Sequence, residues 1–148
     1  MQINSSIATD MLATIKGSLD GGTLVLYHGP TPALADSSLD MVSNHTELVR
    51  IEGGTFDSPF DNVLSKDSGA WSASPVFAGA NESEATLAPT FFRMVGNGGD
   101  PAYPSGPVIQ GSVGGPSSAA ELRLPTATVT NGSSTPVAIA IFNLRLVG

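Results

Sequence analysis

The part of the chain from Ser105 onward constrains the fold most, because it reads as a series of β-strands and little else. Its pattern predicts strands over Ser105–Val113, Ala119–Pro125 and Pro136–Val147, separated by Gly, Ser, Pro and Asn residues that favour turns. Charged and apolar residues alternate in segment 120–124, so one face of that strand should meet water and the other a core. The run 137–142 is entirely apolar, which predicts a strand that is buried on both faces.

The composition supports a single all-β domain. The chain has 148 residues, of which 41% are hydrophobic and only 13% charged, together with 17 Gly and 11 Pro. This length suits one domain with a substantial core, and the many turn-forming residues favour strands over a helical bundle. We expect a β-sandwich or jelly-roll-like domain over residues 23–148 with about seven or eight strands, preceded by a short N-terminal helix or arm over residues 1–22.

The N-terminal segment contains the one helix that the sequence predicts, over residues 6–19, with Ser6 as its cap. Apolar residues recur there at helical spacing, namely Ile7, Met11, Leu12, Ile15 and Leu19. A helix this short is not stable alone, so it must pack on the sheet or on a neighbouring subunit. We expect removal of Met1–Leu19 to weaken assembly more than folding.

Three further strands are predicted in the rest of the chain. They cover Thr23–His28, Thr46–Glu52 and the long segment Ala85–Val95, which carries Arg93 in its middle. The segment Ala70–Phe77 is either an edge strand or an ordered loop, because a proline keeps it away from the centre of a sheet.

Charge and cysteine content limit the partners. The net charge is −7, and the six basic residues are scattered along the chain. Nucleic acids and anionic membranes both require a cluster of positive charge, so we expect neither as a partner. The chain has no cysteine and no recognisable signal peptide, which favours synthesis in a reducing cytoplasm without disulfides.

Residues suited to catalysis do not form a recognisable motif. A hydrolase triad could combine His28 with Asp36 and a serine, and His45 is the other histidine that could act as a base, but no Gly-x-Ser-x-Gly sequence supports a hydrolase. Histidines at a strand end or in a loop are the simpler interpretation.

Acidic residues occur in pairs, which glycosidases use for acid–base chemistry. The pairs lie in turn-like segments where such residues are common, and they are Asp36/Asp40, Asp57/Asp61 and Glu82/Glu84. With Asp67, the aspartates could also form an incidental calcium site, although no calcium-loop motif is present. We therefore assign no catalytic, cofactor-binding or metal-binding residue and predict that the protein is not an enzyme.

Aromatic side chains offer a third kind of site. Trp71, Tyr27 and Tyr103 could act as platforms for a sugar if they were exposed. A lone tryptophan is more often an anchor in a core or interface, and this is the interpretation we favour for Trp71.

The strands carry a pattern that resembles a family of viral structural proteins. The segment 24–36 reads as a strand, then Tyr-x-Gly-x-x-Pro and Ala-x-Ala-Asp, and the aromatic-aromatic-Arg segment 91–95 precedes the Gln-Gly-Ser-Val-Gly segment 108–114. The alternating segment 120–124 and the closing strand 137–147 complete the pattern. It resembles the small structural proteins of tailed bacteriophages, with a poor match over residues 37–90.

This resemblance implies a structural role in the virion. Such proteins are capsid decoration (cement) proteins, tail proteins or head–tail components, and we favour capsid decoration. The resemblance further implies a homotrimer that binds the major capsid protein, with loops 29–45 and 96–106 and the N-terminal segment as contact regions. A tail or head–tail component and a carbohydrate-binding module on the virion surface are the alternatives.

Overall fold

The protein is an all-β domain with one helix, described here from a computed structural model that covers residues 3–145. Met1, Gln2 and the last three residues lie outside the described part, as does the end of the predicted strand that reaches Val147. The elements are α1 (Ser5–Leu19), β1 (Gly22–His28), β2 (Thr46–Gly54), β3 (Val63–Ser65), β4 (Ser72–Ala73), β5 (Ala78–Gly79), β6 (Thr86–Leu87), β7 (Phe91–Val95), β8 (Val108–Gly114), β9 (Leu122–Arg123), β10 (Val129–Thr130), β11 (Val137–Ala138) and β12 (Ile141–Arg145).

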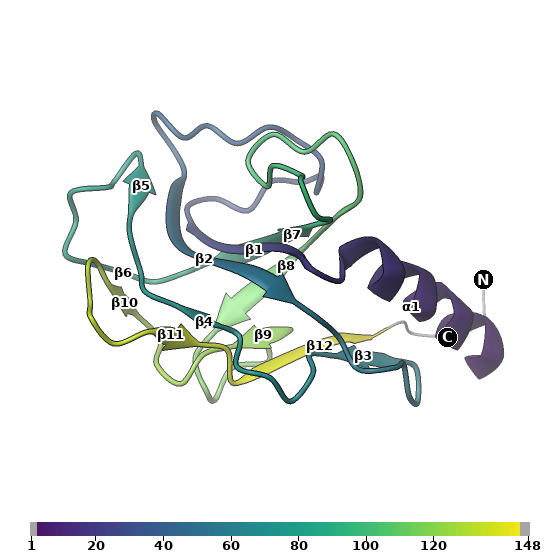
Figure 1. Cartoon of the computed structure of the whole chain (residues 1–148). Helices are drawn as coiled ribbons and strands as arrows, with labels where there is room; N and C mark the ends of the chain where they lie inside the picture. Colours follow the sequence, from purple (N-terminus) through teal and green to yellow (C-terminus); the bar gives the residue numbers. More distant parts are fainter. Residues whose placement is uncertain (1–2, 146–148) are drawn as a thin grey trace.

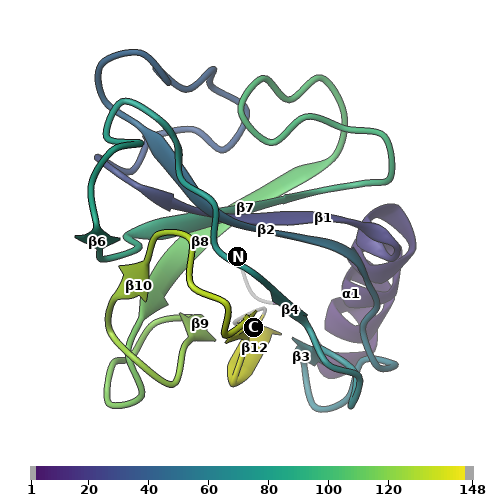
Figure 2. The same cartoon turned by 60° about the vertical axis from the view of Figure 1, so that its left-hand side comes forward.

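One mixed sheet organises the fold. Its eight strands have the order β3-β12-β9-β8-β7-β1-β2-β5, and all neighbours are antiparallel except β8 and β9. Between β8 and β9 the sheet turns over, so that β9, β12 and β3 lie beneath β8, β7, β1 and β2 (Figures 1 and 2). The small pairs β6–β10 and β4–β11 complete the lower layer. A sandwich-like arrangement therefore arises from a single folded sheet.

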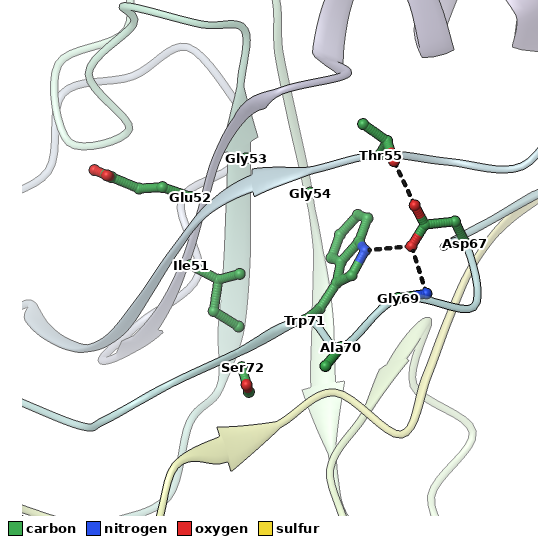
Figure 3. A pocket seen from close by; sticks show the side chains of 10 residues that line it. All are labelled: Ile51, Glu52, Gly53, Gly54, Thr55, Asp67, Gly69, Ala70, Trp71 and Ser72. Atoms are coloured by element: carbon green, nitrogen blue, oxygen red, sulfur yellow. Dashed lines mark hydrogen bonds between the residues drawn. The ribbon is translucent and has the colours of Figure 1, made fainter.

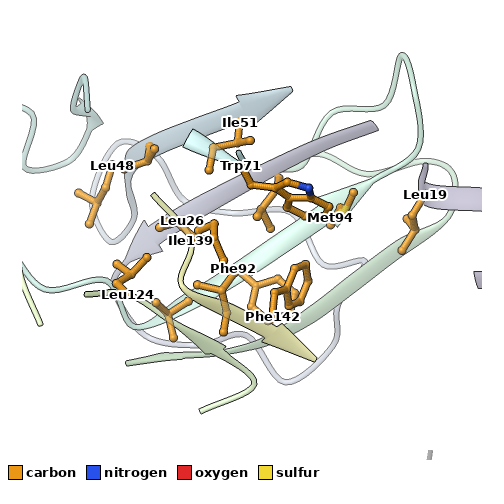
Figure 4. Close-up of a cluster of buried hydrophobic side chains, with 14 of the residues drawn as sticks. Leu19, Leu26, Leu48, Ile51, Trp71, Phe92, Met94, Leu124, Ile139 and Phe142 are labelled. Atoms are coloured by element: carbon orange, nitrogen blue, oxygen red, sulfur yellow. The ribbon is translucent and has the colours of Figure 1, made fainter. Parts of the chain in front are cut away.

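The main core lies between these two layers (Figure 4). From the upper layer come Leu26 in β1 and Phe92 and Met94 in β7. From the lower layer come Trp71, directly before β4, and Phe142 in β12. The rings of Phe92 and Phe142 pack edge to face with their centroids 4.9 Å apart. Aromatic pairs in this geometry contribute about 0.5–1.5 kcal/mol beyond the burial of their area, so this contact helps to hold the two layers together.

Helix α1 belongs to this core. The side chain of Asn4, one residue before the helix, accepts a hydrogen bond from the Ile7 backbone N–H at 2.9 Å, so the cap is Asn4 and not the predicted Ser6. Leu12 and Leu19 are completely or almost completely buried. Deleting the helix would therefore expose core surface and lower the stability of the fold, in addition to any effect on assembly.

Two predicted strands are each divided in two. The segment Ala85–Val95 forms β6 and β7, because Pro89 has no N–H for the ladder and the chain changes partners there. The closing segment forms β11 and β12.

The prediction that 137–142 is buried on both faces is wrong. Phe142 is 1% exposed whereas Ile141 is 40% exposed, and Ala138 and Ala140 also face solvent. The segment lies in the outer layer of the fold, where only Ile139 and Phe142 are buried against the core. By contrast, burial alternates as expected in and beside β9, since Leu122 and Leu124 are buried whereas Glu121 is exposed and Arg123 is half-buried.

Candidate functional site

Burial on both faces, which the sequence predicted for segment 137–142, is found instead in strands β1 and β7. Their alternate residues Leu24, Leu26, Phe92 and Met94 point into the main core. The residues between them pack into a second cluster on the opposite face, formed by Val25, Tyr27, Phe91, Leu39 and Ala102. Leu39 and Ala102 belong to the loops 29–45 and 96–107, so these two loops cover the outer face of the sheet (Figure 1).

A buried arginine connects the two loops to the sheet. Arg93 in β7 is 0% exposed, and its Nε donates to Oε1 of Gln110, its direct partner in β8, at 2.9 Å. Its Nη1 donates to the backbone carbonyls of Ser37 and Pro101, at 2.6 and 3.1 Å. Each of the two loops thus receives a hydrogen bond from the same guanidinium group.

Two further contacts strengthen this attachment. Nη2 of Arg93 donates to the Leu34 carbonyl at 3.3 Å, and Nε2 of Gln110 donates to the Pro32 carbonyl at 2.7 Å. Among the described residues no ion pair joins Arg93 to a carboxylate. Burial lowers the pKa of Arg93, but an arginine remains charged at neutral pH, so carbonyl dipoles compensate the buried cation.

His45 holds the other end of loop 29–45. Its Nδ1 accepts a hydrogen bond from the Asp40 backbone N–H at 3.0 Å, so Nε2 carries the hydrogen and donates to the Pro30 carbonyl at 2.8 Å. Gly29 has a φ of 133°, and a side chain there would lie 2.4 Å from the Asn44 carbonyl oxygen. Only glycine fits this close approach, which brings the two ends of the loop together.

The loops present apolar side chains to solvent. Leu34 is 65% exposed, Val42 is 87% exposed and Tyr103 is 54% exposed. We call the surface of loops 29–45 and 96–107 the loop surface. These exposed apolar side chains stand on anchored loops, the part of a fold that most often carries binding residues.

The two histidines considered for a catalytic role have structural partners. Both ring nitrogens of His45 are occupied by backbone groups, and Nδ1 of His28 donates to the Ala88 carbonyl at 2.7 Å. Within residues 3–145 no hydrogen bond or ion pair joins Asp36 to either histidine. The structure therefore does not assemble the imagined triad.

The paired carboxylates are likewise turn residues. Asp40 accepts hydrogen bonds from the backbone N–H groups of Val42 and Ser43, at 3.2 and 3.0 Å, as expected for an Asx turn. Asp57/Asp61 and Glu82/Glu84 are exposed and lie in turns or in the irregular segments beside them. In the described part of the chain, no group of three or more His, Cys, Asp or Glu side chains could hold a metal ion.

Trp71 is a core anchor, as predicted, with 3% of its surface exposed. It forms one wall of a polar hollow of about 160 Å³ (Figure 3). The Asp67 carboxylate beside it accepts hydrogen bonds from the Thr55 hydroxyl, from Trp71 Nε1 at 3.1 Å and from the Gly69 N–H at 3.0 Å. These bonds lower the pKa of Asp67, and the largest effect comes from Thr55. The bond to Thr55 also connects Asp67 to the residue that follows β2.

Comparison with known proteins adds no assignment. No protein-family model, no curated protein and no solved structure matches this chain. Over residues 3–145, no helix has the length and apolar character needed to cross a membrane.

Sequence reasoning identified both loops but missed what attaches them. The signal was present in the sequence, since Arg93 interrupts the apolar run of segment 91–95. A charged residue at such a position must find polar partners inside the protein. Pro101 lies only eight residues from Arg93, whereas Leu34 and Ser37 belong to a loop that is distant in the sequence, so these partners depend on the tertiary structure.

Proposed function

We propose that this chain is a structural protein of a tailed bacteriophage virion and that it acts as a capsid decoration protein. The observation that carries the proposal is the loop surface, where Leu34, Val42 and Tyr103 are exposed on loops that Arg93 holds in place. The resemblance of the strand pattern to small phage structural proteins supports the same role. The protein would be made in the bacterial cytoplasm and would then join the virion.

The physical requirements of decoration agree with this architecture. Such a protein binds by shape and buried area, so its contact loops must keep their conformation before binding. A loop attached through a buried guanidinium loses less conformational entropy on binding than a free loop does. In this proposal the partner is the major capsid protein, and the protein itself is a homotrimer.

The first experiment is to measure copy number in purified particles by quantitative mass spectrometry. A ratio to the major capsid protein near one copy per shell subunit supports lattice-wide decoration. A far lower ratio points to a tail or head–tail component. Complete absence from particles contradicts the virion proposal.

A second experiment tests the loop surface itself. We expect a variant with Leu34, Val42 and Tyr103 each changed to Ser to fold normally but to lose co-sedimentation with undecorated capsids. Val76→Ser is the matched control, because Val76 is 67% exposed but lies outside both loops. Equal binding by the two variants would place the contact elsewhere on the protein.

The carbohydrate-binding alternative now depends on one residue. Trp71 and Tyr27 are buried, whereas Tyr103 is 54% exposed. Binding of glycans to the wild type, with loss in Tyr103→Ala, would favour this alternative over decoration.

A further inference from the structure

Two Asn-Gly dipeptides occur in the chain, Asn97-Gly98 and Asn131-Gly132, and both lie in turns. The two glycines have positive φ angles of 84° and 70°. In this dipeptide the glycine nitrogen can attack the side-chain amide carbon of asparagine, since glycine has no side chain to hinder the approach. The local sequence therefore makes both sites reactive, and the surrounding structure determines which one reacts.

The fold protects Asn131. Its Oδ1 accepts a hydrogen bond from the Phe77 N–H at 3.1 Å, and its Nδ2 donates to two carbonyl oxygens in the 82–84 turn, at 2.9 and 3.2 Å. The attacking group is also occupied, since the Gly132 N–H donates to the Pro75 carbonyl at 3.1 Å. Both reacting groups are thus engaged in hydrogen bonds that must break before they can react.

Asn97 has none of this protection. It is exposed in loop 96–107, and a side chain placed on Gly98 would meet open space. Within residues 3–145, neither the Asn97 side chain nor the Gly98 N–H makes a hydrogen bond. The turn is closed by one bond, from the Gly99 N–H to the Gly96 carbonyl at 3.0 Å.

We propose that Asn97 is a site of spontaneous deamidation in the folded protein and that Asn131 is not. The Gly98 nitrogen forms a bond to Cγ of Asn97 and loses its proton, while the Cγ–Nδ2 bond breaks and ammonia leaves. Water then opens the resulting succinimide at either carbonyl, which yields aspartate or isoaspartate at position 97.

The product changes the loop surface. Each conversion adds a negative charge close to Asp100, which already lies in this loop. Isoaspartate also lengthens the main chain by one carbon atom and so alters the turn between Val95 and Pro101.

The test is peptide mass spectrometry on the folded full-length protein during incubation in warm, mildly alkaline buffer. We expect the peptide containing Asn97 to gain the mass of an amide-to-acid change about tenfold or more faster than the peptide containing Asn131, because reaction at Asn131 requires local opening. In denaturant the two rates should converge. Asn97→Gln should remove the fast conversion in the folded protein.

Three results would overturn the inference. They are equal rates at the two sites in the folded protein, faster conversion at Asn131, and no conversion at Asn97 over a period in which both sites react in denaturant. Circular dichroism before and after incubation establishes that the protein stays folded.

Discussion

Arg93 and Gln110 are direct cross-strand partners whose side chains meet through a 2.9 Å hydrogen bond from Nε to Oε1. Both side chains then reach backbone carbonyls of loop 29–45, and Arg93 also reaches Pro101 in the other loop. A pair of neighbouring residues in the sheet thereby anchors two loops, one that joins their own strands and one that is distant in the sequence.

Changing this arginine should therefore destabilise the protein strongly. Arg93→Met removes the donor to the Ser37, Pro101 and Leu34 carbonyls, and we expect a loss of about 3 kcal/mol in the free energy of unfolding. Arg93→Lys should also destabilise, because one ammonium group cannot reproduce the planar set of donors. Chemical denaturation measures both effects.

Arg123→Lys provides the control, because Arg123 is only half-buried. We expect its effect to stay within about 0.5 kcal/mol.

A double-mutant cycle with Gln110→Ala should show coupling to Arg93, since the two side chains are in contact. Additive losses would mean that the hydrogen bond contributes nothing to stability.

Neighbouring residues in β12 should respond in opposite ways. Phe142→Ala should cost about 3–5 kcal/mol, because Phe142 is buried against Phe92 and Trp71. Ile141→Ser should change stability by less than about 1 kcal/mol, because Ile141 is 40% exposed. Similar losses in thermal or chemical unfolding would show that both faces of β12 are buried.

The hydroxyl group of Tyr27 is buried, and within residues 3–145 it has no hydrogen-bond partner. Tyr27→Phe removes this group and keeps the ring that stacks on Phe91, so we expect the variant to be at least as stable as the wild type, with a gain of up to about 1 kcal/mol. A clear loss of stability would indicate that the hydroxyl has a partner.

Alkaline pH should destabilise the protein through the buried hydroxyl group of Tyr27. Burial, with a smaller effect from Glu47, raises the pKa of Tyr27 well above its ordinary value of 10.0. Tyr27 therefore ionises at a lower pH in the unfolded chain than in the folded protein. Its contribution to the free energy of unfolding is complete below pH 10.0 and is lost as the pH rises beyond it. Ultraviolet titration should show Tyr27 ionising only as the protein unfolds, and Tyr27→Phe should lack that step.

Acidic pH should act through Asp67. The hydrogen bond from Thr55, with further bonds from Trp71 and Gly69, lowers the pKa of this carboxyl below its ordinary value of 3.8. Its contribution to stability is complete above that value and is lost as pH falls through the lowered pKa. Asp67→Asn should be less stable than the wild type at neutral pH, and the two should converge in acid. Parallel curves of melting temperature against pH would contradict this.

The loops and turns were partly predictable from sequence. Gly29-Pro30 ends β1 as expected, and the helical spacing of the apolar residues correctly predicts α1, although two of the five, Ile7 and Met11, are 47% and 46% exposed. These features depend on backbone preferences and on the spacing of apolar residues within a few positions. Both can be read from the sequence without knowledge of distant contacts. The strand lengths were less predictable, because Ala85–Val95 divides where its two parts find different partners.

By itself the sequence determined that this chain is a single all-β domain with one N-terminal helix, since periodicity and turn residues act locally. Only the tertiary structure decided which strands are buried on both faces. The apolar run 137–142 lies in an outer layer, whereas β7, with Arg93 in its middle, is covered by the core below and two loops above. Burial depends on which segments pack together across long separations, and the attachment of the loops to Arg93 follows from that packing.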